Sequence, residues 1–190
     1  MKKMLVSVLL SSTIALSFGT IAAETYTSDA THTFVSFEYS HLGFSTQRSR
    51  FDKVDATVTL DREHKTGSID VKIDPKSVNT GSEKFNQHLQ SDEFFNVAQF
   101  PTATFKSTKV IFTGDNPSQV EGNLTLKGIT KPVTLTVTNI VCKAHPMMKK
   151  EFCGANATAQ IKRSDFDLGK FAPYVSDETS LIIAIEAGKN

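Results

Sequence analysis

The sequence predicts an all-β fold of eight antiparallel strands with one short helix. Apolar side chains recur at every second position through eight segments, which is the period of a strand with one buried face. One stretch alone has apolar residues at helical spacing, and no segment has the length of the crossover that joins parallel strands. Eight strands that share an apolar face form a sandwich or close into a barrel, and closure removes exposed strand edges. The pattern leaves open whether the interior is filled or hollow.

Residues 1–23 have the composition of a secretory signal peptide. Two lysines precede an apolar stretch, and small residues end it at Ala23. We expect cleavage after Ala23, with Ala22 as the alternative; cleavage after Ala23 leaves residues 24–190 as one exported domain with a single core. The formal net charge of +1 provides no basic field, so nucleic-acid binding is disfavoured.

The first expected strand lies within residues 32–44 and has the most apolar face of the chain. The side chains of this face alternate with polar ones and end in a histidine: Val35, Phe37, Tyr39 and His41. Gly43 marks a turn, and the polar residues 43–50 are expected to form a flexible connection. The central question is whether this face meets an opposing sheet or a bound apolar molecule.

Seven further strands are expected between polar turns. They cover residues 54–60, 69–73, 103–112, 120–126, 133–137, 157–161 and 181–186. An irregularity is expected at Ser107 and Thr108, where the alternation within the fourth strand changes phase.

The one helical stretch runs from Thr80 to Gln90. Thr80 and Glu83 have the spacing of a capping box at its start. Its apolar stripe consists of Phe85, His88 and Leu89. Such a short, one-sided helix needs an apolar partner, and the phenylalanine-rich residues 91–101 follow it directly. We expect this block to form a lid or plug on the sheet.

The chain has two cysteines, Cys142 and Cys153, both in the exported part. An even pair in an oxidising compartment indicates a disulfide bond. A metal site that also uses His145 and a redox couple are the alternatives, although the spacing matches no zinc pattern. No cofactor or metal ion is expected.

The sequence contains no recognisable catalytic constellation. It has no nucleophile elbow, no HExxH motif and no phosphate loop. His41 and Asp165 are the nearest candidates for an acid and a base. His41 and His88 are each open to three interpretations: a hydrogen-bonded residue at the edge of the core, a contact to a ligand head group, or metal and acid–base chemistry.

Four segments occur in an order that is characteristic of a known family. They are HTFVSFEYSHLGF from His32, DEFFNVAQFPTATF from Asp92, GNLTLKGITKPVTL from Gly122 and IKRSDF from Ile161. On these segments the chain resembles the YceI-like family of periplasmic polyisoprenoid-binding proteins. The resemblance implies a lipocalin-like barrel with a short helix at its mouth, which encloses an isoprenoid quinone, polyprenyl phosphate or related amphiphile. The chain departs from the family at Asp167, where glycine is common, and in its cysteine loop, which only some members have.

The resulting hypothesis is a non-catalytic periplasmic carrier that holds a long isoprenoid inside the barrel. The expected ligand-binding residues are Val35, Phe37, Tyr39, His41, Phe44, Phe51, Phe85, His88, Leu89, Phe95, Phe105 and Phe166. One alternative is an enzyme that modifies a lipid in the same cavity. Another is an interaction protein with a packed core, which docks to a membrane cytochrome that handles quinones. Pairing of two subunits stays open.

Overall fold

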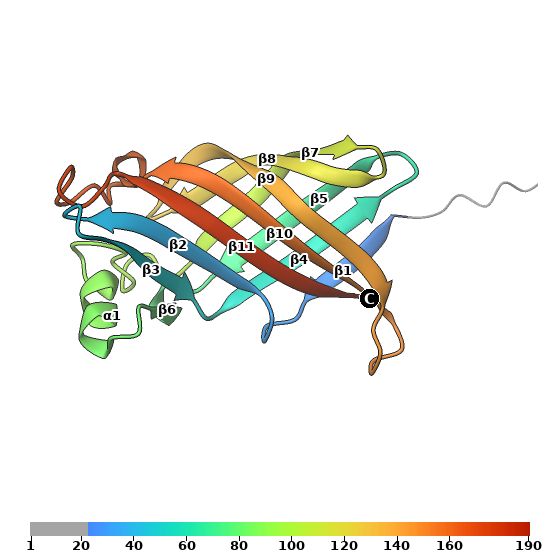
Figure 1. The fold of residues 1–190 in the computed structure, drawn as a ribbon, viewed down its shortest axis with the longest axis horizontal. Helices are drawn as coiled ribbons and strands as arrows, with labels where there is room; N and C mark the ends of the chain where they lie inside the picture. The colour runs from blue at the N-terminus through green and yellow to red at the C-terminus, as the bar shows by residue number, and fades with distance from the viewer. Residues whose placement is uncertain (1–22) are drawn as a thin grey trace, which may run out of the picture.

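The computed structural model describes residues 23–190, which form an antiparallel barrel with one short α-helix at its end (Figure 1). The strands are β1 (Glu24–Ser28), β2 (Phe34–His41), β3 (Ser45–Phe51), β4 (Val54–Asp61), β5 (Thr66–Ile73), β6 (Val78–Asn79), β7 (Ala103–Thr113), β8 (Asn116–Leu126), β9 (Ile129–Ala144), β10 (Glu151–Lys162) and β11 (Glu178–Lys189). The helix is α1 (Glu83–Gln90). No helix in this part of the chain has the length and hydropathy that a membrane span requires. The expected signal peptide lies outside the described residues, except for Ala23.

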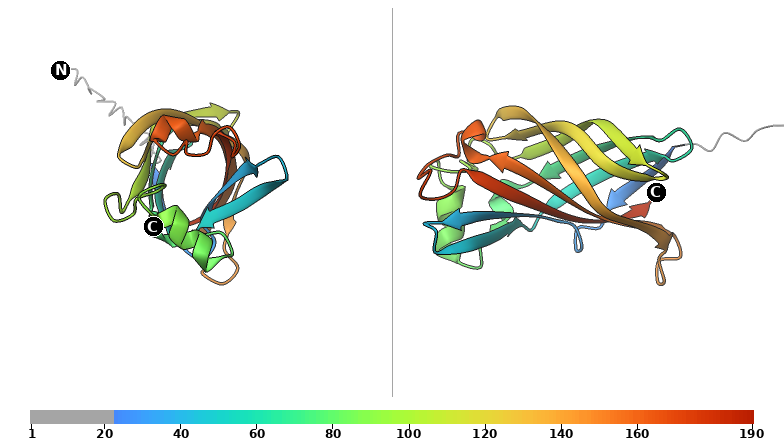
Figure 2. Two further views of the ribbon diagram at one scale, coloured as in Figure 1. Left: turned by 90° about the vertical axis from the view of Figure 1, so that its left-hand side faces the viewer. Right: turned by 45° about the horizontal axis from the view of Figure 1, so that its top comes forward.

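Eight strands close the barrel, as predicted. The ring runs β1-β4-β5-β7-β8-β9-β10-β11 and closes because residues 187–189 of β11 pair with residues 26–28 of β1. Farther along β11, residues 180–184 pair with β2 instead, and the sheet continues through β3 to β6. We call the end of the barrel where β11 pairs with β1 the closed end, and the end where β11 pairs with β2 the mouth. Figure 2 shows the barrel from the mouth, with α1 and the β2–β3 hairpin beside the opening.

The number of ring strands was predicted correctly, but one member of the ring was wrong. The expected first strand is β2, which lies outside the ring, and β1 takes its place. β1 was missed because five mostly polar residues carry no clear alternation. The connection expected at residues 43–50 is largely strand β3, whose polar sequence reflects its exposed face. The irregularity near Ser107 is confirmed as a shift in the register between β7 and β8.

The predicted start of the helix also needs correction. α1 begins at Glu83 after the N-cap residue Ser82, whose side chain makes no capping hydrogen bond. Thr80 instead donates a hydrogen bond through its hydroxyl to Oδ1 of Asn86, at 2.8 Å. The predicted capping box of Thr80 and Glu83 is therefore wrong: Thr80 lies two residues before the N-cap, and its partner is the side-chain amide of Asn86.

Large side chains fill the barrel between its middle and the closed end. Phe105 from β7 lies over Gly122 on β8, where an added Cβ would come within 2.4 Å of the phenyl Cζ atom. Val110 and Val120 are also buried in this layer. The absence of a side chain at Gly122 therefore leaves the space that the Phe105 ring occupies.

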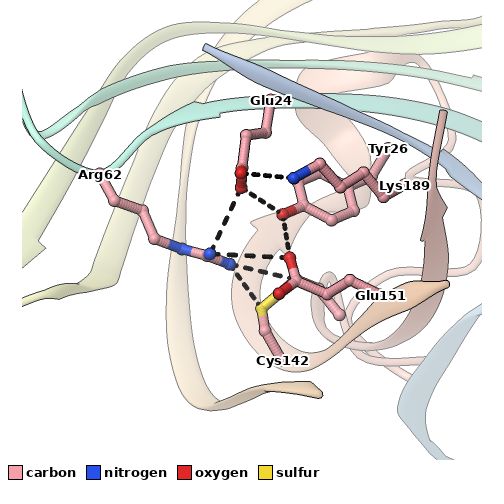
Figure 3. Close-up of polar contacts among 7 residues, drawn as sticks. Glu24, Tyr26, Arg62, Cys142, Glu151 and Lys189 are labelled. Carbon is pink, nitrogen blue, oxygen red and sulfur yellow. Dashed lines mark hydrogen bonds and ion pairs between the residues drawn. A yellow bond between two sulfur atoms is a disulfide. The ribbon is translucent and has the colours of Figure 1, made fainter. Parts of the chain in front are cut away.

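A polar network covers the core at the closed end (Figure 3). The hydroxyl of Tyr26, a fully buried residue, donates to Glu24 at 2.7 Å and to Glu151 at 2.5 Å. Lys189 donates to Glu24, and Arg62 lies within 4 Å of both carboxylates. Burial, followed by the hydrogen bonds with both carboxylates, raises the pKa of Tyr26. The phenol thus stays protonated while it holds two anions together.

The predicted disulfide is confirmed. Cys142 and Cys153 are directly paired on β9 and β10, and their sulfur atoms are bonded. Nη2 of Arg62 lies 2.7 Å from Sγ of Cys142, which joins the disulfide to the polar network of the closed end. The bond therefore fixes the base of the long β9–β10 hairpin against the barrel.

Candidate functional site

A cavity of about 280 Å³ lies at the mouth of the barrel. One continuous stretch of wall comes from three neighbouring strands: Phe37 and Tyr39 of β2, Leu181 of β11, which is paired directly with Phe37, and Ile161 of β10. α1 and the segment that follows it cover the opening, with Leu89 facing inward. The lining is almost entirely apolar, as expected for a site that binds an apolar molecule by removing it from water.

Aromatic packing fixes the lid to the wall. The ring of Phe95, in the segment after α1, packs edge-on against Phe37 and Phe51, with centroid distances of 6.2 and 5.4 Å. Phe37 and Phe51 are themselves 5.4 Å apart. Such edge-to-face contacts add to the area that the rings bury. The predicted lid is therefore held over the cavity by the same aromatic residues that line it.

The structure brings together eight of the twelve predicted ligand-binding residues. The eight that line the cavity are Phe37, Tyr39, His41, Phe51, Phe85, His88, Leu89 and Phe95. Val35, Phe105 and Phe166 are buried but do not line it. Phe44 points away from the cavity into solvent, with 87% of its surface exposed.

The main part of the cavity wall that sequence reasoning missed is the loop between β10 and β11. It contributes Arg163, Leu168, Lys170, Phe171 and Val175. This loop has no strand or helix period, so alternation gave no signal for it. Leu181 is different, because it belongs to an alternating strand and shares its inward face with Ile183.

Arg163 organises that loop. Its guanidinium donates to the backbone carbonyls of Ser176, Leu168, Lys170 and Val175 at 2.5 to 3.2 Å. Burial lowers the pKa of the guanidinium, whereas the neighbouring carboxylate of Asp177 opposes that shift. Because four N–H groups of the side chain already have acceptors, Arg163 holds the loop in place and has little capacity left for a ligand.

The cavity also contains weakly solvated hydroxyl groups. Burial raises the pKa of Tyr39, so its phenol is neutral in the cavity wall. The hydroxyl of Thr179, another lining residue, is buried without a hydrogen-bond partner in the described part of the chain. Burying a hydroxyl without a hydrogen-bond partner costs free energy. A polar ligand atom that accepted a hydrogen bond from Thr179 would remove this cost.

The two histidines lie at the edge of the cavity. His41 ends β2 and is exposed, and His88 lies on α1 with its ring 4.9 Å from that of Phe94. Asp165 does not line this cavity and belongs to a separate surface hollow beside Lys162. The two candidate acid–base residues, His41 and Asp165, therefore do not face a common space. Within residues 23–190, no cluster of three or more His, Cys, Asp or Glu residues could hold a metal ion.

Comparison with known proteins agrees with this architecture. Residues 26–187, nearly all of the described chain, match the YceI-like domain. The chain belongs to the YceI-like family. Protein YceI of Salmonella arizonae is 38% identical over 188 residues, which cover 98% of this chain and 97% of the relative.

Solved structures of the YceI-like fold superimpose on the barrel. BcnA of Burkholderia cenocepacia matches with a TM-score of 0.72 and 26% identity, over 84% of this chain and 98% of its own. The YCEI protein of Campylobacter jejuni matches with a TM-score of 0.67 and 27% identity, over 80% and 90%. A domain of Saccharophagus degradans, described as polyisoprenoid binding, has a TM-score of 0.63 over 87% and 98%; its 19% identity supports the fold alone.

The backbone conformation at Asp167 accounts for the resemblance of this position to a glycine site. This residue has a φ of +55°, in the left-handed region where glycine is favoured and aspartate is tolerated. Nζ of Lys127 donates to both the backbone and the side-chain oxygen of Asp167, at 2.9 and 2.8 Å. The aspartate therefore occupies a glycine-type position and gains a contact that glycine lacks.

Proposed function

We propose that this protein is a non-catalytic carrier that holds an isoprenoid at the mouth of its barrel. The observation that carries the proposal is the apolar cavity at the mouth of the barrel, which is lined largely by aromatic and aliphatic side chains. The polyisoprenoid-binding description of the Saccharophagus degradans domain supports the same class of ligand. The disulfide supports an exported, periplasmic location, because such bonds persist in oxidising compartments.

The size of the cavity limits how the guest binds. Its volume of about 280 Å³ is slightly below the roughly 300 to 1,000 Å³ of typical ligand sites. A long isoprenoid therefore places only part of its chain in this space, and the rest extends through the mouth unless the lid moves.

The charges favour a neutral head group over a phosphate inside the cavity. Arg163 is already bonded to backbone carbonyls, and Lys170 pairs with Glu93. A buried phosphate without a free cation would lose its hydration with little compensation. The carbonyl oxygen of a quinone or an isoprenoid alcohol would instead meet the hydroxyls of Tyr39 and Thr179.

A catalytic function has less support. The enzymatic alternative needs an acid and a base that face one reacting group, and His41 and Asp165 line different hollows. The alternative of an interaction protein requires a fully packed interior, and the cavity at the mouth does not fit that requirement. A membrane cytochrome as partner and pairing of two subunits stay predictions.

Two adjacent residues of β11 provide a matched test. Leu181 lines the cavity, whereas Ile182 points outward with 40% of its surface exposed. The chain has no tryptophan, so Leu181→Trp and Ile182→Trp each also introduce a single fluorescent reporter. We expect Leu181→Trp to fill the cavity and weaken isoprenoid binding at least tenfold, because the indole takes the space of the guest.

The measurement is a titration of wild type and both variants with an isoprenoid alcohol and with its phosphate of equal chain length. Ile182→Trp should bind as wild type does, and wild type should prefer the alcohol. Equal affinity of the two variants would contradict the location of the site. A preference for the phosphate would contradict the argument about the head group.

A further inference from the structure

Four large, mostly apolar side chains are exposed on two adjoining segments at the mouth of the barrel. They are Leu42, Phe44, Phe171 and Tyr174, with exposed fractions of 48, 87, 51 and 74%. We call these four residues the mouth rim. Exposed apolar groups gathered around one opening are unusual on a soluble protein and indicate a surface that contacts something apolar.

The rim is a single surface built from two distant segments. Leu42 and Phe44 lie in the β2–β3 turn, and Tyr174 lies in the β10–β11 loop. The backbone N–H of Leu42 donates to the carbonyl of Tyr174 at 2.8 Å, and His41 forms a bridge with Val175. Both segments extend toward the same end of the barrel in Figure 1.

The turn presents Phe44 in a fixed position. Leu42 and Gly43 both have positive φ values, of 54° and 74°, as in the tight turns that match the twist of a hairpin. The N–H of Phe44 donates to the carbonyl of His41 at 3.0 Å and closes the turn. The backbone at Phe44 is therefore already ordered before the side chain contacts a partner, so only side-chain freedom is lost on contact.

The rim is continuous with the wall of the cavity. Phe171 is half exposed on the rim and also lines the cavity, where its ring lies 6.3 Å from that of Phe94. An apolar path therefore leads from the outer surface to Leu89 and Phe37 inside. A guest that entered from water would expose its tail, whereas a guest that entered from a bilayer through this path would not.

The charges near the rim are balanced. Lys170 pairs with Glu93, Lys127 pairs with Asp167, and Arg48 pairs with Glu38. A surface that bound anionic lipid by electrostatic attraction would carry unmatched cations. The pairing instead favours contact by insertion of apolar side chains into the interface of a bilayer.

We propose that the mouth rim docks on the surface of a phospholipid bilayer, with Phe44 and Tyr174 inserted at the boundary between head groups and acyl chains. In this orientation the cavity opens onto the membrane, and an isoprenoid passes between them without crossing water. The proposal rests on the proposed carrier function for the identity of the guest, but docking itself is measurable without one.

The opposite end of the molecule offers a matched control. Met147 and Met148, at the tip of the β9–β10 hairpin, are also exposed, at 81 and 55%, but lie away from the cavity. We compare two double variants. The rim variant carries Phe44→Ser and Tyr174→Ser, and the hairpin variant carries Met147→Ser and Met148→Ser. Neither pair lines the cavity, and both pairs are exposed, so folding should be unaffected.

The first measurement is flotation of the full exported chain with phosphatidylcholine vesicles. We expect the rim variant to partition to vesicles at least tenfold less than wild type, and the hairpin variant to partition as wild type does. Raising the salt concentration from 0.05 to 0.5 M should change the partition of wild type less than twofold, because screening acts on charges and not on apolar insertion. Equal partition of wild type and rim variant, or loss in the hairpin variant, would overturn the proposal.

The second measurement separates docking from guest binding. The rim variant should bind an isoprenoid alcohol in detergent-free titration as tightly as wild type, but take it up from vesicles more slowly. Leu181→Trp should do the reverse, with normal flotation and weak guest binding. Normal flotation of wild type without any guest binding would remove the carrier function and leave the docking surface in place. If the rim variant instead lost affinity for the guest at equilibrium, the rim would be part of the binding site. That result would overturn the docking proposal.

Discussion

The two ends of the barrel are built from the same alternating strands but differ in what they enclose. At the closed end, β1 completes the ring and the fully buried Tyr26 lies beneath a network of charges and a disulfide. At the mouth, β11 pairs with β2, which lies outside the ring, and a helical lid covers a cavity of about 280 Å³. Alternation determines which side chains point inward. Strand pairing and side-chain size then decide whether the interior is filled.

The largest expected contrast in stability lies between two tyrosines. Tyr26→Ala should lower the free energy of unfolding by about 4 kcal/mol, because it empties a packed site and leaves two carboxylates without their shared donor. Tyr39→Ala should cost about 2 kcal/mol, because its ring borders an existing cavity and has fewer packed neighbours. Denaturant unfolding measures both. Equal losses would contradict the division into a packed and a hollow end.

Removal of the disulfide should act on the closed end only. Replacing Cys142 and Cys153 together by serine should lower the free energy of unfolding by about 3 kcal/mol, since a short loop is no longer closed in the unfolded chain. Isoprenoid affinity should stay within twofold of wild type, because the cavity lies at the other end. Calorimetric unfolding and ligand titration on the same sample test this. A large loss of affinity would show that the two ends are coupled.

Substitution of Gly122 tests the packed layer around Phe105, which we call the floor because it lies between the cavity and the closed end. Gly122→Ala should destabilise by about 2 kcal/mol, because its methyl group would overlap the ring of Phe105. Gly154→Ala is the matched control, since its added Cβ has no neighbour closer than 3.8 Å, and its effect should stay within about 0.5 kcal/mol. If Phe105 moves toward the mouth, isoprenoid affinity should also fall. A stable Gly122→Ala protein with unchanged affinity would mean that the floor is loosely packed.

The smallest expected effect is a dependence on acid pH. The hydrogen bond from Lys189 lowers the pKa of Glu24 in the folded protein, so this carboxylate contributes stability above its ordinary pKa and loses it as the pH falls through the folded value. Glu24→Gln should therefore flatten the decrease in unfolding free energy below pH 4.5. Glu93 at the mouth also has a pKa lowered by its Lys170 hydrogen bond, but it is exposed, so Glu93→Gln should change the profile less. A larger effect at Glu93 would reverse the comparison.

Sequence reasoning predicted the parts of this molecule that obey a period. The alternating segments gave seven of the eight ring strands, and the stripe at Phe85, His88 and Leu89 gave the lid. The alternation of apolar and polar residues identified which faces point inward. It could not distinguish Phe37, which lines the cavity, from Val35, which is buried beside it. That distinction depends on depth along the barrel, which only the register between strands determines.

The rest of the site could not be found in this way. The loop that carries Arg163 and Phe171 is held by hydrogen bonds from one guanidinium to scattered carbonyls, and no local spacing encodes them. Phe44 shows the opposite error. It was assigned to the ligand because it is aromatic and adjoins the first strand, but the turn at Leu42 and Gly43 directs it outward.

The most direct test of the carrier account is native mass spectrometry of the protein purified from its own host. The account predicts one isoprenoid bound per chain in wild type and in Ile182→Trp, and its loss in Leu181→Trp. A wild-type protein that arrives empty, and takes up no isoprenoid when one is supplied, would contradict the account.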